Sequence, residues 1–315
     1  MMTTLQKKLM FLLTTPLLST ILCCSCASTK SGETPHKRDT EIERNFSLAS
    51  TAYSSGDPHK ASLYYFKALE RARFINDPQA IGNAAYNYAA CLIQAGDISN
   101  ALTFLQESEA EYKTAGAAPY EIIFLHAKVL EELGDYDAAL SKLASINLPG
   151  AERSKQCTAD IITARLLHKK GEDDKAYHQI SEIVKHRKEF EQLSPFMQAE
   201  AMRIMGGILL KRQNEKEGLK AMEKAIALYK NSGAFSDMAK ALKEKGDALL
   251  ASDKISAIDC YIQAARTFYY SNQPDKAKEV LSQIDLALKG LKDIPPELAV
   301  RIDVIKKLVS SLAKP

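Results

Sequence analysis

The six histidines of this 315-residue chain could hold a metal ion or move protons, but their spacing fits neither kind of site. None belongs to an HExxH segment, in which two histidines on one helix face bind zinc and the glutamate acts as a base. No cysteine and histidine residues cluster with the spacing of a zinc site. The sequence also contains no GxSxG segment for a nucleophilic serine and no glycine-rich phosphate loop. We therefore predict that the chain is not an enzyme and uses no metal and no cofactor.

Neighbouring carboxylates are the remaining groups that could exchange protons with a substrate. Glu131-Glu132 and Glu172-Asp173-Asp174 stand at the ends or turns of predicted helices, where a solvated surface explains them. The chain carries 42 basic and 39 acidic residues, a net charge of +3, and no pronounced run of Lys and Arg with interleaved aromatic residues. We do not expect nucleic acid to be a partner.

The cysteines fall into two groups with different expected roles. Cys91, Cys157 and Cys260 stand singly in helical stretches, so they fit small buried apolar residues better than a disulfide framework. The other three lie within residues 23–26, directly after an apolar stretch.

Residues 1–25 have the order of an export signal. A short basic part ends in Lys7 and Lys8, an apolar stretch runs from Leu9 to Leu22, and small residues and cysteines follow. This order resembles the signal peptide of bacterial lipoproteins, in which a cysteine after small residues is acylated and becomes the new N-terminus. The alternatives are a plain secreted protein and an uncleaved anchor helix.

Cys26 is the predicted lipid-bearing residue, because the small Ser25 precedes it. Cys24 is the alternative, since it keeps the aliphatic Ile21 three places before it, where Cys26 has Cys23.

The residue after the acylated cysteine indicates in which of the two membranes a lipoprotein is anchored. In the lipoprotein family Asp at that place often marks retention at the inner membrane. Ala27, or Ser25 for the alternative Cys24, points instead to the outer membrane, with the chain facing the periplasm. Residues 26–43 are polar without an apolar period, which predicts a flexible tether.

A repeat of small and large apolar residues runs through the rest of the chain. Small residues that open a second helix recur at intervals of 37 to 42 residues, and a large apolar residue stands four places after each. Another small residue stands eleven or twelve places before each of them. The three columns are Ala61, Ala101, Ala139, Ala176, Gly218 and Ala257; Tyr65, Leu105, Leu143, Ile180, Met222 and Tyr261; and Ala49, Ala89, Ala127, Ala164, Gly206 and Gly246. Such columns predict pairs of closely packed helices.

The turns between the paired helices are also repeated. Glycine can end a helix in the left-handed conformation, and an acidic residue suits the first turn of the next helix. Between the two helices of each of the first four units stands such a glycine followed by an acidic residue: Gly56-Asp57, Gly96-Asp97, Gly134-Asp135 and Gly171-Glu172. The fifth and sixth units have Gln213-Asn214 and Ser252-Asp253 in place of this pair.

These columns and turns resemble the tetratricopeptide repeat. The resemblance implies an all-α protein, a right-handed solenoid of helical hairpins with about 14 helices in about 6–7 repeats. It covers residues 44–271, and residues 272–315 are expected to add helices that cap the array. An ordinary helical bundle is the alternative, but a bundle has no reason to repeat its hairpin geometry in register.

In tetratricopeptide arrays the first helices of the hairpins line a concave groove. Asn87 resembles the asparagine that hydrogen-bonds the backbone of a bound peptide in several members, and the basic residues would pair with carboxylates of an acidic segment. A solvated groove wall is the alternative interpretation of those basic residues. The resemblance assigns to the groove Asn83, Tyr86, Asn87, Phe124, Lys128, Arg165, Lys169 and Arg203.

The expected function is that of a non-enzymatic scaffold, anchored in the bacterial cell envelope, that binds another protein or an extended peptide. An assembly factor for outer-membrane proteins, a pilus or a secretion machine is a more specific version of the same resemblance. Two other classes stay open. One is a regulatory subunit of an envelope enzyme, and the other is a cell-wall binder that uses the aromatic residues at 64–66 and 268–270.

Overall fold

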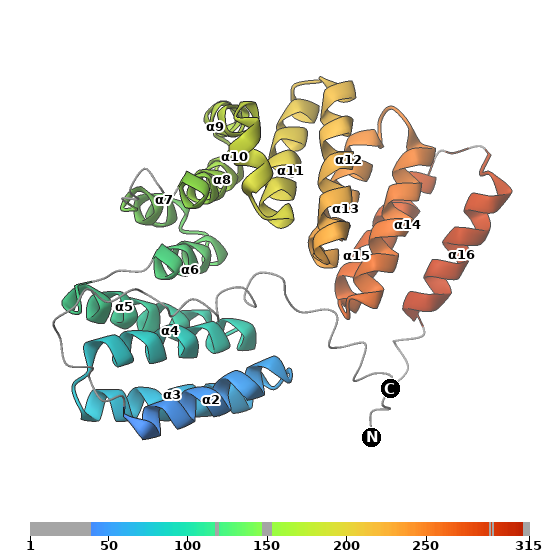
Figure 1. Cartoon of the computed structure of the whole chain (residues 1–315). Coiled ribbons are helices and arrows are strands. Elements are labelled where there is room, and N and C mark those ends of the chain that lie inside the picture. The colour runs from blue at the N-terminus through green and yellow to red at the C-terminus, as the bar shows by residue number, and fades with distance from the viewer. Residues whose placement is uncertain (1–38, 117–119, 147–152, 290, 292, 311–315) are drawn as a thin grey trace. The chain divides into compact units, whose positions relative to one another are not determined.

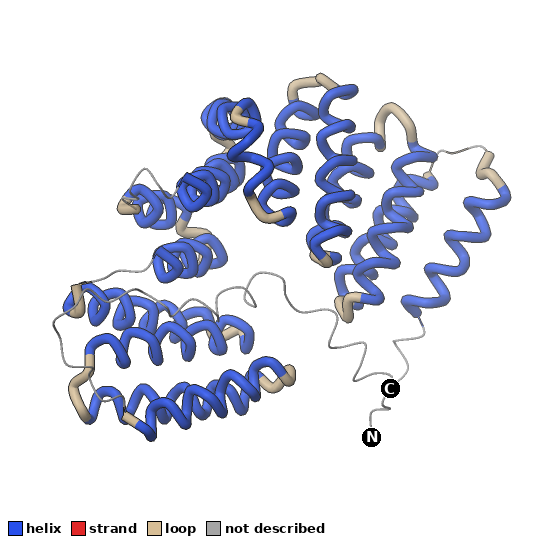
Figure 2. Tube along the Cα trace, viewed as in Figure 1, coloured by secondary structure: helices blue, strands red, loops and turns tan. Residues whose placement is uncertain are grey.

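The computed structural model describes residues 39–116, 120–146, 153–289, 291 and 293–310. Regular secondary structure in this part of the chain is entirely helical, with fifteen helices and no strand (Figures 1 and 2). The contacts among the helices divide the chain into two compact units. We call them unit 1, which holds α2 to α7, and unit 2, which holds α8 to α16. The predicted all-α class is confirmed.

Unit 1 consists of three helical hairpins in which each helix packs on the helix before it and the helix after it (Figure 1). Ile42, Leu69 and Ile81 share one apolar cluster between α2, α3 and α4, and Leu92 and Leu105 belong to another between α4, α5 and α6. Packing restricted to neighbours is typical of repeat arrays. The helices are α2 (Thr40–Ser54), α3 (Pro58–Phe74), α4 (Pro78–Ala95), α5 (Ile98–Thr114), α6 (Tyr120–Glu132) and α7 (Tyr136–Ala144).

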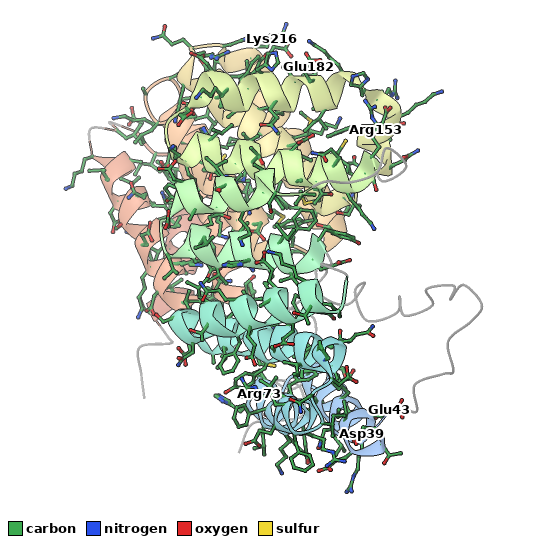
Figure 3. All side chains as sticks on the ribbon, turned by 90° about the vertical axis from the view of Figure 1, so that its left-hand side faces the viewer. Asp39, Glu43, Arg73, Arg153, Glu182 and Lys216 are labelled. Carbon is green, nitrogen blue, oxygen red and sulfur yellow. The ribbon has the colours of Figure 1, made fainter. Side chains whose placement is uncertain are left out.

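Unit 2 consists of four hairpins and one short additional helix. Its last four helices share an apolar core that includes Ile258, Tyr261 and Ile305. The helices are α8 (Arg153–Lys169), α9 (Asp173–Lys185), α10 (Arg187–Gln192), α11 (Pro195–Lys211), α12 (Glu215–Ser232), α13 (Phe235–Leu249), α14 (Lys254–Tyr270), α15 (Pro274–Leu288) and α16 (Pro296–Ser310). Charged side chains project from both units, among them Glu43, Arg73, Arg153 and Lys216 (Figure 3).

The three columns of small and large apolar residues are buried throughout both units. Every one of their eighteen members is buried, from Ala49 in α2 to Tyr261 in α14. The small members allow the paired helices to approach, and the large members fill the space between hairpins. The predicted hairpin pattern is therefore confirmed.

The turns between paired helices also have the expected backbone. All four predicted turn glycines have φ between 78° and 84°, in the left-handed region that favours glycine. Asp57, Asp97 and Asp135 cap the helices that follow them, each accepting a hydrogen bond from the backbone N–H three residues on. Glu172 makes no such bond. In the fifth unit Gln213 takes φ 61°, so a residue with a side chain keeps the left-handed geometry there.

Two boundaries differ from the expectation. Helix α2 begins at Thr40, before position 44, because Asp39 accepts hydrogen bonds from Glu41 N at 3.0 Å and Ile42 N at 3.1 Å and so acts as its N-cap. Helix α10 was not predicted. It contacts α8 and α9 and buries Phe190, and it lies within the longest interval of the repeat.

The isolated cysteines and one carboxylate show how burial follows the repeat. Cys91, Cys157 and Cys260 are buried free thiols, as predicted. Glu131 is buried with 8% of its surface exposed, contrary to the prediction of a solvated pair with Glu132. It stands one helical turn after the buried Ala127, on the face of α6 that the column occupies.

The predicted signal peptide, with Cys26 and Cys24, lies outside the described residues. Among the helices that the structure describes, none is both long and apolar enough to cross a membrane.

Helices α11 and α12 approach closely at two glycines of the columns. A Cβ on Gly206 would lie 3.0 Å from Gly218 O and 3.1 Å from Met222 N. Both are backbone atoms, which cannot move aside without shifting the helix. A Cβ on the adjacent Gly207 would lie 3.6 Å from His168 Nε2, an ordinary contact.

We expect opposite effects from alanine at these two neighbouring glycines. Gly206→Ala should lower the free energy of unfolding by about 1–3 kcal/mol, because the added methyl overpacks the crossing of α11 and α12. Gly207→Ala should raise that free energy by up to about 1 kcal/mol, because alanine favours the helix. Urea unfolding followed by circular dichroism measures both. Equal shifts of the two midpoints would contradict the close approach.

Candidate functional site

Five of the residues predicted to line a groove lie on two contacting helices of unit 1, α4 and α6. Asn83, Tyr86 and Asn87 share one face of α4, and Phe124 and Lys128 stand one turn apart on α6. Asn83 and Lys128 are exposed, and the other three are half-buried. We call the surface around these five residues the first-helix face.

Asn83 is held by a tyrosine that approaches from α5. The Tyr112 hydroxyl donates a hydrogen bond to Asn83 Oδ1, and Ser108 Oγ donates one to Gly82 O at 2.7 Å. Gly82 makes this approach possible, since a Cβ there would lie 2.6 Å from the Tyr112 ring. Asn87 Nδ2 donates to Asn83 O at 2.8 Å. Both amides are therefore oriented by bonds within the protein.

Two further tyrosines belong to the first-helix face. Gln94 Nε2 donates a hydrogen bond to the hydroxyl of Tyr53, which links α4 to α2. The ring of Tyr120 meets the ring of Phe124 edge-on, with centroids 5.5 Å apart. Neither tyrosine was among the predicted site residues, since that set took no residue from α2 and none before Phe124 in α6.

The hydroxyls of Tyr53, Tyr86 and Tyr112 stay protonated at neutral pH. Burial raises the pKa of Tyr53 and of Tyr112 to about 12. Burial also raises the pKa of Tyr86, and the nearby Glu121 carboxylate raises it further. A neutral hydroxyl can both donate and accept a hydrogen bond. The face thus offers polar groups that carry no charge.

This arrangement suits recognition better than catalysis. In the part of the chain that the structure describes, no three His, Cys, Asp or Glu side chains are placed to hold a metal ion. Tyrosine presents a large rigid contact area with a polar tip, and an amide can pair with both groups of a peptide backbone. Most residues of the first-helix face are of these two kinds, and the face also has the ring of Phe124, the Glu121 carboxylate near Tyr86, and Lys128 as an exposed cation.

The basic residues predicted for the groove in unit 2 have internal partners. Arg165 Nη1 lies 3.1 Å from Glu200 Oε2, and Arg203 Nε lies 3.3 Å from Glu200 Oε1. Arg203 Nη1 also lies 2.9 Å from Glu244 Oε1. Lys169 is exposed at the end of α8. The two arginines therefore act first as partners of the buried Glu200 carboxylate.

Glu200 is the centre of this buried cluster, with 4% of its surface exposed. Burial opposes ionisation of the Glu200 carboxyl, but Arg203 and Arg165 together hold its pKa at about 2. The Tyr229 hydroxyl of α12 donates a further hydrogen bond to Glu200. Glu200 joins three helices of unit 2, α8, α11 and α12, and Arg203 adds α13 through Glu244.

A second buried carboxylate, Glu109, organises the last hairpins of unit 1. Lys142 Nζ lies 2.8 Å away, Lys113 Nζ 2.9 Å, and His126 Nδ1 3.3 Å. Burial opposes its ionisation, but the two lysines hold the pKa of Glu109 at about 2. Burial, followed by Lys142, lowers the pKa of His126, which favours a neutral imidazole. Neither buried cluster was predicted.

Comparison with known proteins identifies the fold. No protein-family model and no curated protein matches the sequence. Among solved structures 62 chains match. A tetratricopeptide repeat protein from Parabacteroides merdae is 12% identical with a TM-score of 0.53, and the match covers 86% of this chain and 98% of that one.

Two other matches have lower TM-scores. The MamA RS-1 ArsTM double mutant is 16% identical over 62% of this chain and 98% of its own, with a TM-score of 0.47. The TPR2AB domain of yeast Sti1 in its pHSP90 complex is 15% identical over 78% of this chain and 98% of its own, with a TM-score of 0.34. The fold of the present chain is that of tetratricopeptide repeat proteins.

We expect charge reversal to separate internal from surface cations. Arg203→Glu should lower the free energy of unfolding by about 3–5 kcal/mol, because it leaves the buried Glu200 beside a like charge. Lys128→Glu should change that free energy by less than about 0.5 kcal/mol, because Lys128 is exposed. Thermal unfolding followed by circular dichroism measures both. A stable, cooperative Arg203→Glu variant would show that this arginine is not needed for the fold.

Proposed function

We propose that this chain is a non-enzymatic scaffold that binds another protein or an extended peptide on the first-helix face of unit 1. The observation that carries the proposal is the combination of tyrosines with two amides that internal hydrogen bonds hold in place. Tyr112 fixes Asn83, and Asn83 O accepts from Asn87. Groups that are already oriented lose little conformational entropy when a ligand binds.

The chemistry of the face favours a peptide backbone as the bound group. Within the described residues, Asn83 Nδ2 and Asn87 Oδ1 have no hydrogen-bond partner, so one donor and one acceptor are open to a ligand. A backbone amide unit carries one donor and one acceptor to match them. Tyr86, Tyr120 and Phe124 would contact the side chains of the bound segment.

Fewer basic residues are proposed to contact an acidic ligand than the sequence predicted. Lys128 is an exposed cation on the face, and it can pair with a carboxylate of the ligand. Arg165 and Arg203 are largely neutralised by Glu200 and Glu244. An acidic residue of a ligand bound on the first-helix face would therefore lie near Lys128.

We further propose that the chain is lipid-anchored in a bacterial cell envelope, at the outer membrane and facing the periplasm. The support is the order of residues 1–25 and the small Ser25 before Cys26. The polar residues 26–39 would separate the anchor from the helical part. Such a scaffold would hold its ligand close to the membrane surface.

We expect a photo-crosslinking amino acid at Asn83 or Lys128 to capture the ligand in cells. The same group at Gln106, an exposed position of α5, is the matched control and should not capture it. The measurement is the pattern of crosslinked bands identified by mass spectrometry.

A second variant tests whether the amides take part. With the crosslinking group at Lys128 and Asn83 in place, Tyr112→Phe removes the hydrogen bond to Asn83 while keeping the ring against Gly82, and it should reduce the crosslinked yield several-fold. Identical adducts from Gln106 and Asn83, or no adduct from either position on the face, would contradict the proposed binding surface.

We expect Cys26→Ser to release the chain from the membrane fraction and Cys24→Ser to leave it there. The mass of the mature N-terminus should show an acylated Cys26. The reverse pattern would assign the lipid to Cys24. An unacylated N-terminus beyond Cys26 would refute the anchor.

A further inference from the structure

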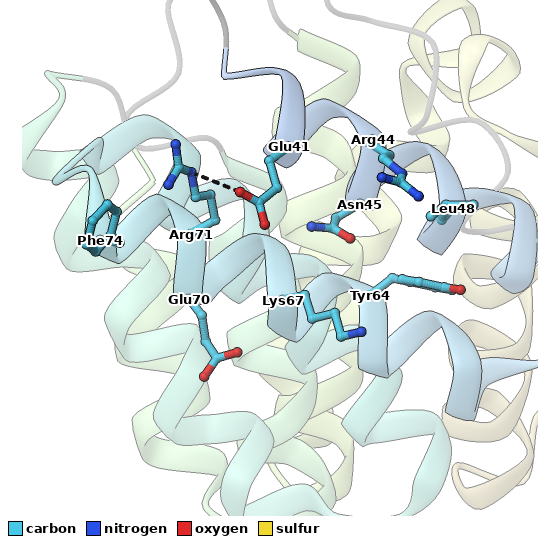
Figure 4. A pocket seen from close by; sticks show the side chains of 9 residues that line it. All are labelled: Glu41, Arg44, Asn45, Leu48, Tyr64, Lys67, Glu70, Arg71 and Phe74. Carbon is cyan, nitrogen blue, oxygen red and sulfur yellow. Dashed lines mark ion pairs between the residues drawn. The ribbon is translucent and has the colours of Figure 1, made fainter.

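The first hairpin carries an open pocket of about 730 Å³ between α2 and α3 (Figure 4). It is separate from the first-helix face. Its lining includes Arg44, Asn45 and Leu48 of α2 and Tyr64, Lys67 and Phe74 of α3. The Asn45 side chain extends from α2 over the α3 residues Tyr64 and Lys67 (Figure 4).

The second hairpin shows what this part of a hairpin binds within the chain itself. The columns place equivalent residues forty positions apart, as Ala49 and Ala89 do. The counterparts of Leu48, Tyr64 and Lys67 are therefore Tyr88, Phe104 and Glu107, and the counterpart of Asn45 is Ala85.

In the second hairpin a helix covers these counterparts. Leu69 and Ala72 of α3 pack in one apolar cluster with Ile81 and Ala85 of α4. The ring of Phe66, also in α3, lies 5.2 Å from that of Tyr88. The corresponding surface of the first hairpin, on α2 and α3, would accommodate a helix in the same way.

The covering helix also makes a charged contact. Arg73 of α3 donates two hydrogen bonds to Glu107, at 2.8 Å and 2.7 Å (Arg73 is labelled in Figure 3). Lys67 holds the place of Glu107 in the first hairpin, so the sign of the charge is reversed. Within the described residues Lys67 pairs with no carboxylate, whereas Arg71 is already bound by Asp39 at 2.8 Å.

The rest of the pocket supports the same kind of ligand. Asn45 is 9% exposed, and among the described residues it forms no hydrogen bond, so it can pair with a polar group of an incoming helix. Leu48 and Phe74 are 37% and 75% exposed and would supply apolar contact. Two carboxylates, Glu41 and Glu70, also line the pocket, and Glu41 lies 3.4 Å from Arg71. The preference for an acidic ligand therefore depends on the local positions of Lys67 and Arg44 and not on net charge.

We propose that the α2–α3 pocket binds an amphipathic helix of another protein, and that this helix carries an acidic side chain where α3 carries Arg73. The helix would lie across α2 and α3 as α3 lies across α4 and α5. Its acid would meet Lys67, and its apolar ridge would meet Leu48 and Tyr64. This second site would let the scaffold hold one partner by an extended segment and another by a helix.

The test uses two synthetic helical peptides that copy residues 58–75, one unchanged and one with Arg73→Glu. Each is titrated into the purified full chain at low salt, and fluorescence anisotropy measures its dissociation constant. The Arg73→Glu peptide should bind about fivefold more tightly, the size expected for one partly exposed ion pair replacing a like-charge contact. Lys67→Glu in the chain should reverse that preference.

Lys60→Glu is the matched control, because Lys60 is an exposed residue of α3 that does not line the pocket. It should leave the preference unchanged, and circular dichroism should show all variants folded. Equal binding of the two peptides, or binding of neither, would overturn the proposal and identify the first hairpin as a polar cap. Self-association of the chain that Lys67→Glu abolishes would overturn it in favour of a second copy.

Discussion

The close approach of paired helices at small residues is the constraint on which the rest of this structure depends. A hairpin of two amphipathic helices cannot cover its own apolar surface, so it must stack on the hairpins next to it. Alanine and glycine at the crossings, from Ala49 to Gly246, permit that stacking. Once the helices are fixed in this way, the first helices within each unit present their remaining residues on one surface of that unit. The first-helix face and the α2–α3 pocket both result from this stacking of hairpins.

Much of the fold could be predicted because its signals are local. Each hairpin repeats a small residue, a turn and a large apolar residue within a short stretch. The left-handed backbone of the first four turns favours glycine, so glycine marks these turns in the sequence. The exceptions are equally physical. Helix α10 lies outside the columns, so the repeat gave no reason to expect it. Helix α2 starts early because of one capping aspartate, Asp39, which the apolar pattern does not register.

Less of the candidate site could be predicted, because its contacts cross between helices. The repeat register assigned Asn83, Tyr86 and Asn87 to the groove, and these residues share one face of α4. It did not reveal that Tyr112 of α5 reaches Asn83 past Gly82, which depends on the space left by a missing Cβ. Register also says nothing about charge partners. The clusters around Glu109 and Glu200 had to be seen in three dimensions, and they changed the expected role of Arg165 and Arg203 from ligand contacts to internal partners.

The cluster around Glu200 also bears on how unit 2 comes apart. Arrays held only by neighbouring contacts tend to lose their hairpins one after another, since each interface melts on its own. Glu200 of α11 binds groups from α8 and α12, and Arg203 extends the cluster to α13. Separating α8 from α11 would leave the buried Glu200 carboxylate without one of its two arginine partners in a poorly hydrated interior, and separating α12 would remove the Tyr229 hydrogen bond. Hairpins that belong to different repeats are thereby joined into a single cooperative block, which would open in one step and not fray from its edges.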